Sequence, residues 1–217
     1  MPFDRQLIQI TEEYLKDAFN QSGAAERNAA SAAYRIEHSY RVANIGRIIA
    51  QKEGFDETAM VIGCLLHDVA YCRELTTPEE QRGHGRLSAK IARPFLNELG
   101  LSREVVEDIC YGIAIHVDDA ADFDGTRTPF AETISDADNI DRFDAYRLYE
   151  GLLYVKFHEM TLAEKRQRVA AMSKQLQSLK DYHMATQTAE QLWQERINYA
   201  ISFYQKLNAQ LQTSDTL

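Results

Sequence analysis

A histidine and an aspartate stand side by side at His67-Asp68, at the end of an apolar run that begins at Ala59. Together they offer an imidazole nitrogen and a carboxylate oxygen to one point in space, and many protein-bound metal ions accept both donor types. Burying either group without a partner costs free energy, so the pair needs a counterpart in the fold. It therefore predicts a metal site.

Other histidines lie on the apolar faces of predicted helices. His38 precedes Val42 and Ile49 by four and eleven residues. This helical spacing places the histidine on the inward face. His84 and His116 lie on similar apolar stripes of two later segments. Four segments of the chain can thus bring a histidine to a common interior.

Each of these histidines has a simpler interpretation as a hydrogen-bonded core residue, which is the commoner role of a single inward-facing histidine. His158 and His183 also follow apolar residues at helical spacing, but neither has a carboxylate beside it. The contiguous His67-Asp68 pair, flanked by other inward-facing histidines, distinguishes the candidate group.

The elements that must position these side chains are predicted to be helices. Apolar residues make up 45% of the 217 positions, with only 10 glycines and 4 prolines. This composition is typical of an all-α protein. Loops are expected over about 72–82 and 117–129. The apolar periodicity predicts helices over about 4–20, 25–53, 56–68, 83–99, 102–116, 131–158, 161–183 and 188–211.

The charge of the chain bears on its partners. A net charge of −9 argues against broad binding to nucleic acid or to anionic lipid, because both require a basic face. No apolar segment is long enough to span a bilayer, and the first residues lack the pattern of a secretory signal. The three cysteines form no C-x-x-C motif and are expected to be reduced. We expect a cytoplasmic protein with no membrane partner.

The order of the candidate residues resembles a known family. The chain contains His38, then Leu66-His67-Asp68, then His84-Gly85, then His116, and finally Ala137-Asp138-Asn139-Ile140. This order is similar to that of the HD-domain superfamily of metal-dependent phosphohydrolases, whose signature is a separated histidine, a His-Asp pair and a distant aspartate. The resemblance covers about residues 35–147 and implies an all-α, phosphodiesterase-like helical bundle. The additional histidines resemble the branch with two metal ions.

The resemblance also implies roles for individual residues. It makes His67 and Asp68 the catalytic pair and Asp68 a bridge between two ions. It implies that the first ion is held by His38, His67, Asp68 and Asp138, and the second by Asp68, His84 and His116. The cofactor would be one or two divalent ions of manganese, magnesium, cobalt, nickel, zinc or iron.

Asp136 is an alternative to Asp138 as the last ligand. The two residues are two positions apart and lie on nearly opposite faces of a helix, so only one can face a site built by other helices. Asp138 is preferred because it follows an alanine and precedes an x-Ile step, as the last aspartate of the family usually does.

Four arginines could complement the charge of a phosphate: Arg41, Arg82, Arg86 and Arg142. Each could equally form a surface ion pair. Glu37 and Asp138 stand four residues before Arg41 and Arg142, which is a favourable spacing for such a pair on a helix.

Three functions fit these observations. The leading one is hydrolysis of a phosphate ester, which would be a nucleotide or a related small metabolite. The alternatives are a di-iron oxygenase of the HD type and a non-catalytic metal-binding regulatory module. Residues 69–73 contain no lysine after the His-Asp pair, which argues against the cyclic-dinucleotide branch. The chain has no Glu-Asp pair of the kind used by the branch that hydrolyses guanosine tetraphosphate, which argues against that branch.

The length favours one all-α domain over residues 1–217. Within it we expect an HD core over about 25–158. Helices over about 161–212 would complete the bundle or form an interface, and a homodimer is a further expectation.

Overall fold

The computed structural model describes residues 3–118 and 123–215, and every regular element within them is helical. The all-α prediction is confirmed. The chain forms two compact units, Met1–Asp138 and Asn139–Leu217, each described by itself below. The predicted single domain with a core over about 25–158 stays a prediction. Among the described helices, none has both the length and the apolar character needed to cross a membrane.

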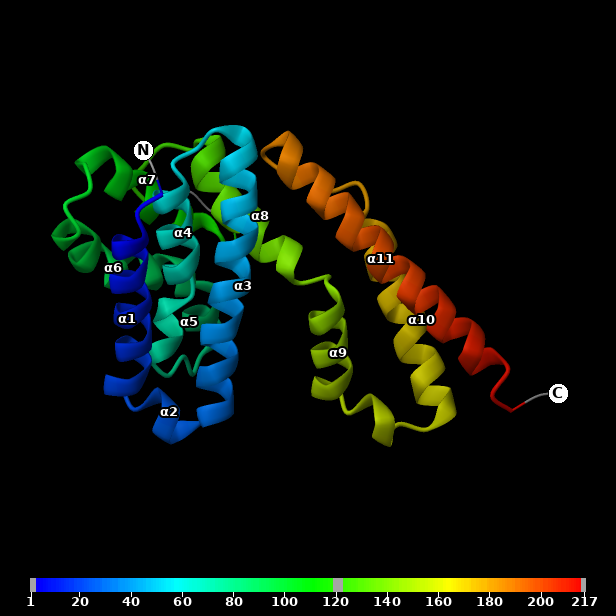
Figure 1. The fold of residues 1–217 in the computed structure, drawn as a ribbon. Coiled ribbons are helices and arrows are strands. Elements are labelled where there is room, and N and C mark those ends of the chain that lie inside the picture. The colour runs from blue at the N-terminus through cyan, green and yellow to red at the C-terminus, as the bar shows by residue number, and fades with distance from the viewer. Residues whose placement is uncertain (1–2, 119–122, 216–217) are drawn as a thin grey trace. The chain divides into compact units, whose positions relative to one another are not determined.

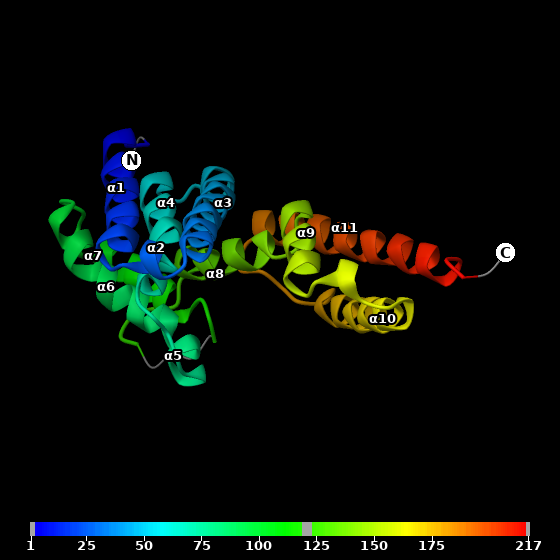
Figure 2. The same ribbon diagram turned by 90° about the horizontal axis from the view of Figure 1, so that it is seen from below.

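The first unit is built around α4 (Glu57–Leu66), which lies between α1 and α3 in both views (Figures 1 and 2). The helices α6 and α7 pack against each other and against the same core. The remaining elements of this unit are α1 (Arg5–Gln21), α2 (Ala24–Arg27), α3 (Ala29–Glu53), η1 (Val69–Cys72), α5 (Pro78–Arg82), α6 (His84–Glu98), α7 (Arg103–Ile115) and the start of α8 (Pro129–Asp141).

The central helix is buried over nearly its whole length, from Thr58 to Leu66. Each fully buried leucine, isoleucine or methionine in it contributes roughly 1.5–3 kcal/mol through the hydrophobic effect. A close contact with α3 depends on Gly46, because a Cβ atom there would lie 2.6 Å from Sγ of Cys64. The helix begins at Asp56, whose side chain accepts a hydrogen bond from the Ala59 amide. It therefore delivers His67-Asp68 into the interior.

Two predicted helices differ from the observed ones because of capping residues. Asn28 has an extended backbone, and its side chain accepts from the Ser31 amide, so α3 begins at Ala29 rather than near residue 25. The helix predicted over 131–158 is interrupted after α8. Asp144 is extended there and caps α9 (Ala145–Tyr154), which starts a new helix.

The segment 72–82 was predicted as a loop but contains the short helix α5. Thr77 and Glu80 form a reciprocal capping box that stabilises its first turn. Pro94 lies inside α6, and the helix continues through it. Ser102 caps the helix that leads to His116.

The second unit consists of α9, η2 (Phe157–Glu159), α10 (Leu162–Leu179) and α11 (Gln187–Gln212). The helices α10 and α11 lie side by side in both views (Figures 1 and 2). Trp193 of α11 is buried, with Phe143 and Tyr182 in edge contact with its ring. The predicted C-terminal helices are thus present, while their role in completing a bundle or an interface stays a prediction.

Candidate metal centre

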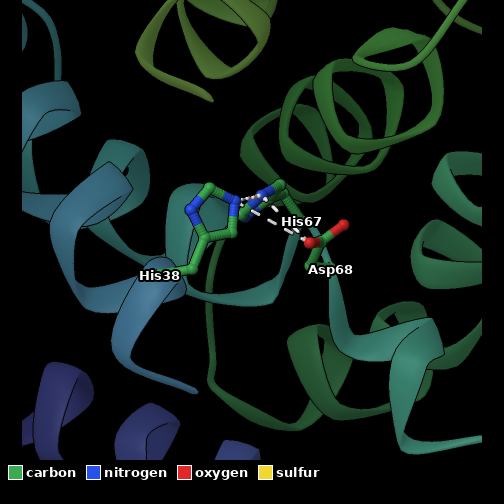
Figure 3. A group of neighbouring side chains, drawn as sticks. All are labelled: His38, His67 and Asp68. Carbon is green, nitrogen blue, oxygen red and sulfur yellow. Dashed lines mark hydrogen bonds and ion pairs between the residues drawn. The ribbon is translucent and has the colours of Figure 1, made fainter. Parts of the chain in front are cut away.

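The six side chains predicted as metal ligands converge in the first unit. His38 comes from α3, His67 and Asp68 follow α4, His84 begins α6, His116 follows α7, and Asp138 comes from α8. All except Asp138 are buried, and the Asp138 side chain is only 16% exposed. Figure 3 shows His38 and the His67-Asp68 pair directed toward one another. Three overlapping groups of these residues have donor atoms close enough to share an ion.

Asp68 lies at the middle of the cluster, with its two oxygens directed to different histidine pairs. Its Oδ2 atom is 3.8 Å from Nε2 of His38 and 3.7 Å from Nε2 of His67. Its Oδ1 atom is 3.0 Å from Nε2 of His84 and 3.6 Å from Nε2 of His116. One carboxylate thus faces two separate groups of nitrogen donors.

Asp138 lies nearest to the His38–His67 pair, and it also shares a group of close donor atoms with His67 and His116. Its Oδ1 atom lies 3.0 Å from Nε2 of His38 and 3.9 Å from Nε2 of His67. Asp136 is also buried. Among the described residues, however, the groups that could hold an ion include Asp138 and not Asp136. The structure therefore favours the preferred aspartate over its alternative.

Backbone carbonyls orient three of the four imidazole rings. The Nδ1 atoms of His67, His84 and His116 lie 2.7, 2.5 and 2.7 Å from carbonyl oxygens three residues earlier in the chain. A carbonyl oxygen only accepts, so each of these Nδ1 atoms carries the proton and donates it. In the neutral ring, Nε2 then presents a lone pair to the cluster.

These orientations test whether the cluster fits a metal ion. The Nε2 atoms of His84 and His116 are 3.1 Å apart, and those of His38 and His67 are 3.3 Å apart. With both Nδ1 atoms of the His84–His116 pair protonated, two lone pairs face each other, which is favourable only with a positive charge between them. Nitrogen donors with carboxylate oxygens form a donor set suited to divalent transition metals. The residues therefore fit metal binding.

The ionisation of the cluster agrees with this donor set. Burial alone would raise the pKa of Asp68, but the surrounding imidazole rings of His67, His116 and His84 hold it well below its usual range. Burial likewise opposes ionisation of Asp138, while its hydrogen bond with His38 lowers its pKa. Both carboxylates are ionised near neutral pH and concentrate negative charge in the interior.

Two of the histidines differ in their ionisation. Burial lowers the pKa of His67 to about 4, so this ring is neutral near pH 7. Burial also disfavours a charge on His116, but the nearby carboxylate of Asp68 raises its pKa. A positive charge is thus drawn to the His116 side of Asp68.

A glycine permits the close approach of the helices that carry His84 and His116. A Cβ atom on Gly85 would lie 2.8 Å from the carbonyl oxygen of Ala114 and 2.9 Å from that of Ile113. It would also lie 3.1 Å from Nδ1 of His116. Only glycine fits here without displacing backbone, so the residue after His84 helps to bring the two rings together.

The four predicted phosphate-binding arginines lie in different environments. Arg82 is exposed and pairs with Glu79 at 2.8 Å, as a surface ion pair would. Both terminal nitrogens of Arg86 lie 3.2 Å from the carboxylate of Asp118. Arg142 belongs to the second unit and donates to Asn139 at 3.2 Å. Arg41 is partly buried on α3, one turn after His38. Phosphate binding by these residues stays a prediction.

Two residues that sequence reasoning missed contact the cluster. Nη1 of Arg35 lies 2.8 Å from Oδ2 of Asp68. The same guanidinium stacks 3.5 Å above the ring of Tyr71, which in turn lies 4.8 Å from the ring of His84. The sequence spacing could have indicated Arg35, because it stands three residues before His38 and lies on the same helix face. The spacing alone does not distinguish it from Arg41, three residues after His38.

Comparison with known proteins agrees with this geometry. Residues 35–142, about half of the chain, match the model of the HD domain family. The crystal structure of a predicted HD superfamily hydrolase from an uncultured Thermotogales bacterium has a similar fold. The two chains align over 91% of each, with a TM-score of 0.58 and 19% sequence identity. No curated protein matches this sequence. With its helical fold, its His-Asp pair and this family match, the chain belongs to the HD-domain superfamily.

Proposed function

We propose that this protein is a metal-dependent phosphohydrolase that cleaves a phosphate ester, either a nucleotide or a related small phosphometabolite. The observation that carries the proposal is the position of Asp68 between two pairs of imidazole nitrogens. A carboxylate shared in this way is suited to hold two cations near each other, as in many enzymes that catalyse phosphoryl transfer.

The proposed ligands follow from the two groups around Asp68. His38, His67 and Asp138 would hold the first ion, together with Oδ2 of Asp68. His84 and His116 would hold the second, together with Oδ1 of Asp68. When bound, divalent ions lower the pKa of a water molecule and stabilise the negative charge that develops during displacement at phosphorus.

The protein's own side chains would prepare the site for that chemistry. The carbonyl acceptors of His67, His84 and His116 fix the ring orientations, so little reorganisation is needed when a cation enters. Asp68 and Asp138 offset the charge of the cations. Arg35, held against Asp68 and Tyr71, places a fixed positive charge at the edge of the centre, where it could bind a phosphoryl oxygen.

Two further arguments support a hydrolase. The Thermotogales chain with the similar fold is described as a predicted hydrolase. All six residues of the extended ligand pattern are present and converge, whereas a module that only binds a partner needs no such complete set. The di-iron oxygenase remains the alternative chemistry for the same ligands, and the identity of the bound metal distinguishes the two.

The proposal is tested by the release of inorganic phosphate from a panel of phosphate monoesters and nucleotides. The protein is stripped with a chelator and then restored with single metal ions. We expect activity to return with a divalent ion and to be lost in His67→Ala, while His158→Ala, which changes an exposed histidine, retains it. Full activity in His67→Ala, or no phosphate release with any ion, would contradict the proposal.

A further inference from the structure

We propose that a pocket beside the metal centre binds a second phosphate group, so that the substrate carries one phosphate beyond the one that is cleaved. This inference rests on the proposed function and narrows its substrate class. The pocket has a volume of about 310 Å³ and lies in the first unit. Its size is at the lower end of the range for small-molecule sites, which suits a compact leaving group.

Arginines dominate the charged lining of the pocket, although the charge of Arg35 is partly offset by Asp68. The pocket is lined by three arginines, Arg27, Arg35 and Arg73, against a single acidic residue, Glu74. These arginines come from three different segments, namely α2, α3 and the residue after η1. Because like charges repel, guanidinium groups that converge from separate segments favour an anion between them.

Two of the three arginines are held in place by the fold. Arg27 donates from Nη1 to the Ser22 carbonyl at 2.7 Å and from Nη2 to the Cys72 carbonyl at 2.9 Å. These acceptors are uncharged, so the positive charge of Arg27 is not neutralised. Arg35 is fixed by Asp68 and by stacking on Tyr71. A site with preset charges loses little conformational entropy when an anion binds.

Arg73 supplies the adaptable part of the site. It is exposed at the rim, and no described residue forms a hydrogen bond or an ion pair with its guanidinium. Polar side chains of Asn28 and Ser31 line the same pocket. A phosphate here would gain a charged donor in Arg73 that the protein does not otherwise use.

The pocket and the metal centre share a wall. Arg35 and Tyr71 line the pocket, and these same side chains contact Asp68 and His84, respectively. A molecule that reaches from the centre into the pocket therefore passes along Arg35 and Tyr71. The scissile phosphate would lie at the metal ions, and the second phosphate would lie among Arg27, Arg35 and Arg73.

The test compares alkanediol bisphosphates of three to six carbons with the monophosphates of the same chain length. We expect kcat/KM for the best bisphosphate to exceed that of its monophosphate by about tenfold or more, since charge-assisted hydrogen bonds contribute this much. Arg73→Ala should lower this ratio by about tenfold, and Arg73→Lys should restore part of it. Arg103→Ala, which removes an exposed arginine outside the pocket and the centre, is the matched control and should keep the ratio.

A binding measurement separates this inference from the proposed function. Isothermal titration calorimetry with the corresponding alkane bisphosphonates and monophosphonates needs no hydrolysis, because the carbon–phosphorus bond is not cleaved. Tighter binding of the bisphosphonate, lost in Arg73→Ala, would support the pocket even if no ester were hydrolysed. Equal affinities in the wild type, or a preference that Arg73→Ala leaves unchanged, would overturn the inference even if monophosphates were hydrolysed.

Discussion

The two halves of the metal centre differ in the carboxylate oxygens that they contain. The half around His38 and His67 has Oδ2 of Asp68 and a second carboxylate from Asp138. Around His84 and His116, the carboxylate oxygen that lies within 4 Å of both Nε2 atoms is Oδ1 of Asp68. Asp138 approaches His116 less closely, in a group that also contains His67. With Asp138 assigned to the first half, as proposed above, that half has four protein donors and the second has three.

This difference indicates separate roles for the two halves. A four-donor site leaves little room for other ligands, as in structural metal sites. A three-donor site leaves positions open for water or for an oxygen of the substrate. We therefore expect the first half to bind its ion more tightly, and the second half to exchange its ion more readily and to face the substrate.

Asp68→Ala should have the largest effect, because this residue is the only one that belongs to both halves. We expect the bound metal to fall from about two ions to near none and phosphatase activity to fall by at least about 10³-fold. Elemental mass spectrometry and a phosphate-release assay measure the two losses, and circular dichroism checks that the variant remains folded. A variant that keeps one half loaded would show that Asp68 is not shared.

His84→Ala and His116→Ala should remove one ion of two, because they change only the three-donor half. The first half then keeps all four of its donors. Metal content per chain, measured after dialysis, should fall to about one. His183→Ala, which alters a histidine that is 87% exposed, serves as the control. An unchanged stoichiometry in both variants would contradict the two-ion assignment.

Gly85→Ala should affect the second half without removing a ligand. The added methyl group would press on the carbonyls of Ile113 and Ala114 and separate α6 from α7. We expect a loss of about 1–3 kcal/mol in the free energy of unfolding and a weaker second ion, with the first ion retained. Thermal unfolding and metal titration test this together. Gly151→Ala, at a glycine with open space around it, is the matched control and should show neither effect.

Arg86→Ala and Arg82→Ala should have the smallest effects and should differ from each other. Arg86 is mostly buried near His84 and is held by Asp118, whereas Arg82 is exposed in a surface ion pair. We expect kcat/KM to fall by about tenfold in Arg86→Ala and to change little in Arg82→Ala, because exposed ion pairs contribute little. Equal changes of kcat/KM in the two variants would show that Arg86 contributes no more to activity than Arg82.

Much of the candidate site could be predicted because its residues recur at helical spacing with the apolar residues of the core. His38 shares a stripe with Val42 and Ile49, and the core that buries these apolar residues also buries the histidine. Helical spacing indicates that only one of Asp136 and Asp138 can face the site. The preference for Asp138 came from the resemblance to the HD-domain family, whose last aspartate usually follows an alanine. The apolar periodicity shows which face of each helix points inward. Candidate ligands on those inward faces can therefore be found from the sequence.

Other features depend on tertiary contacts that periodicity does not encode. Arg35 and Arg41 are both three residues from His38, and only the packing of α3 on α4 places Arg35 beside Asp68. The interruption after α8 has no proline or glycine to mark it, and the Asp144 cap competes with an otherwise continuous helical pattern. The arginine pocket joins segments that are far apart in the sequence.

The most direct test of the central claim is the metal content of the wild-type protein, purified without added metal or a metal-affinity tag. Elemental mass spectrometry should find about two divalent ions per chain, and chelation should remove the ion of the three-donor half first. A single ion per chain after reconstitution with excess metal would contradict the shared position of Asp68. Two irons would instead indicate oxidative chemistry at the same ligands.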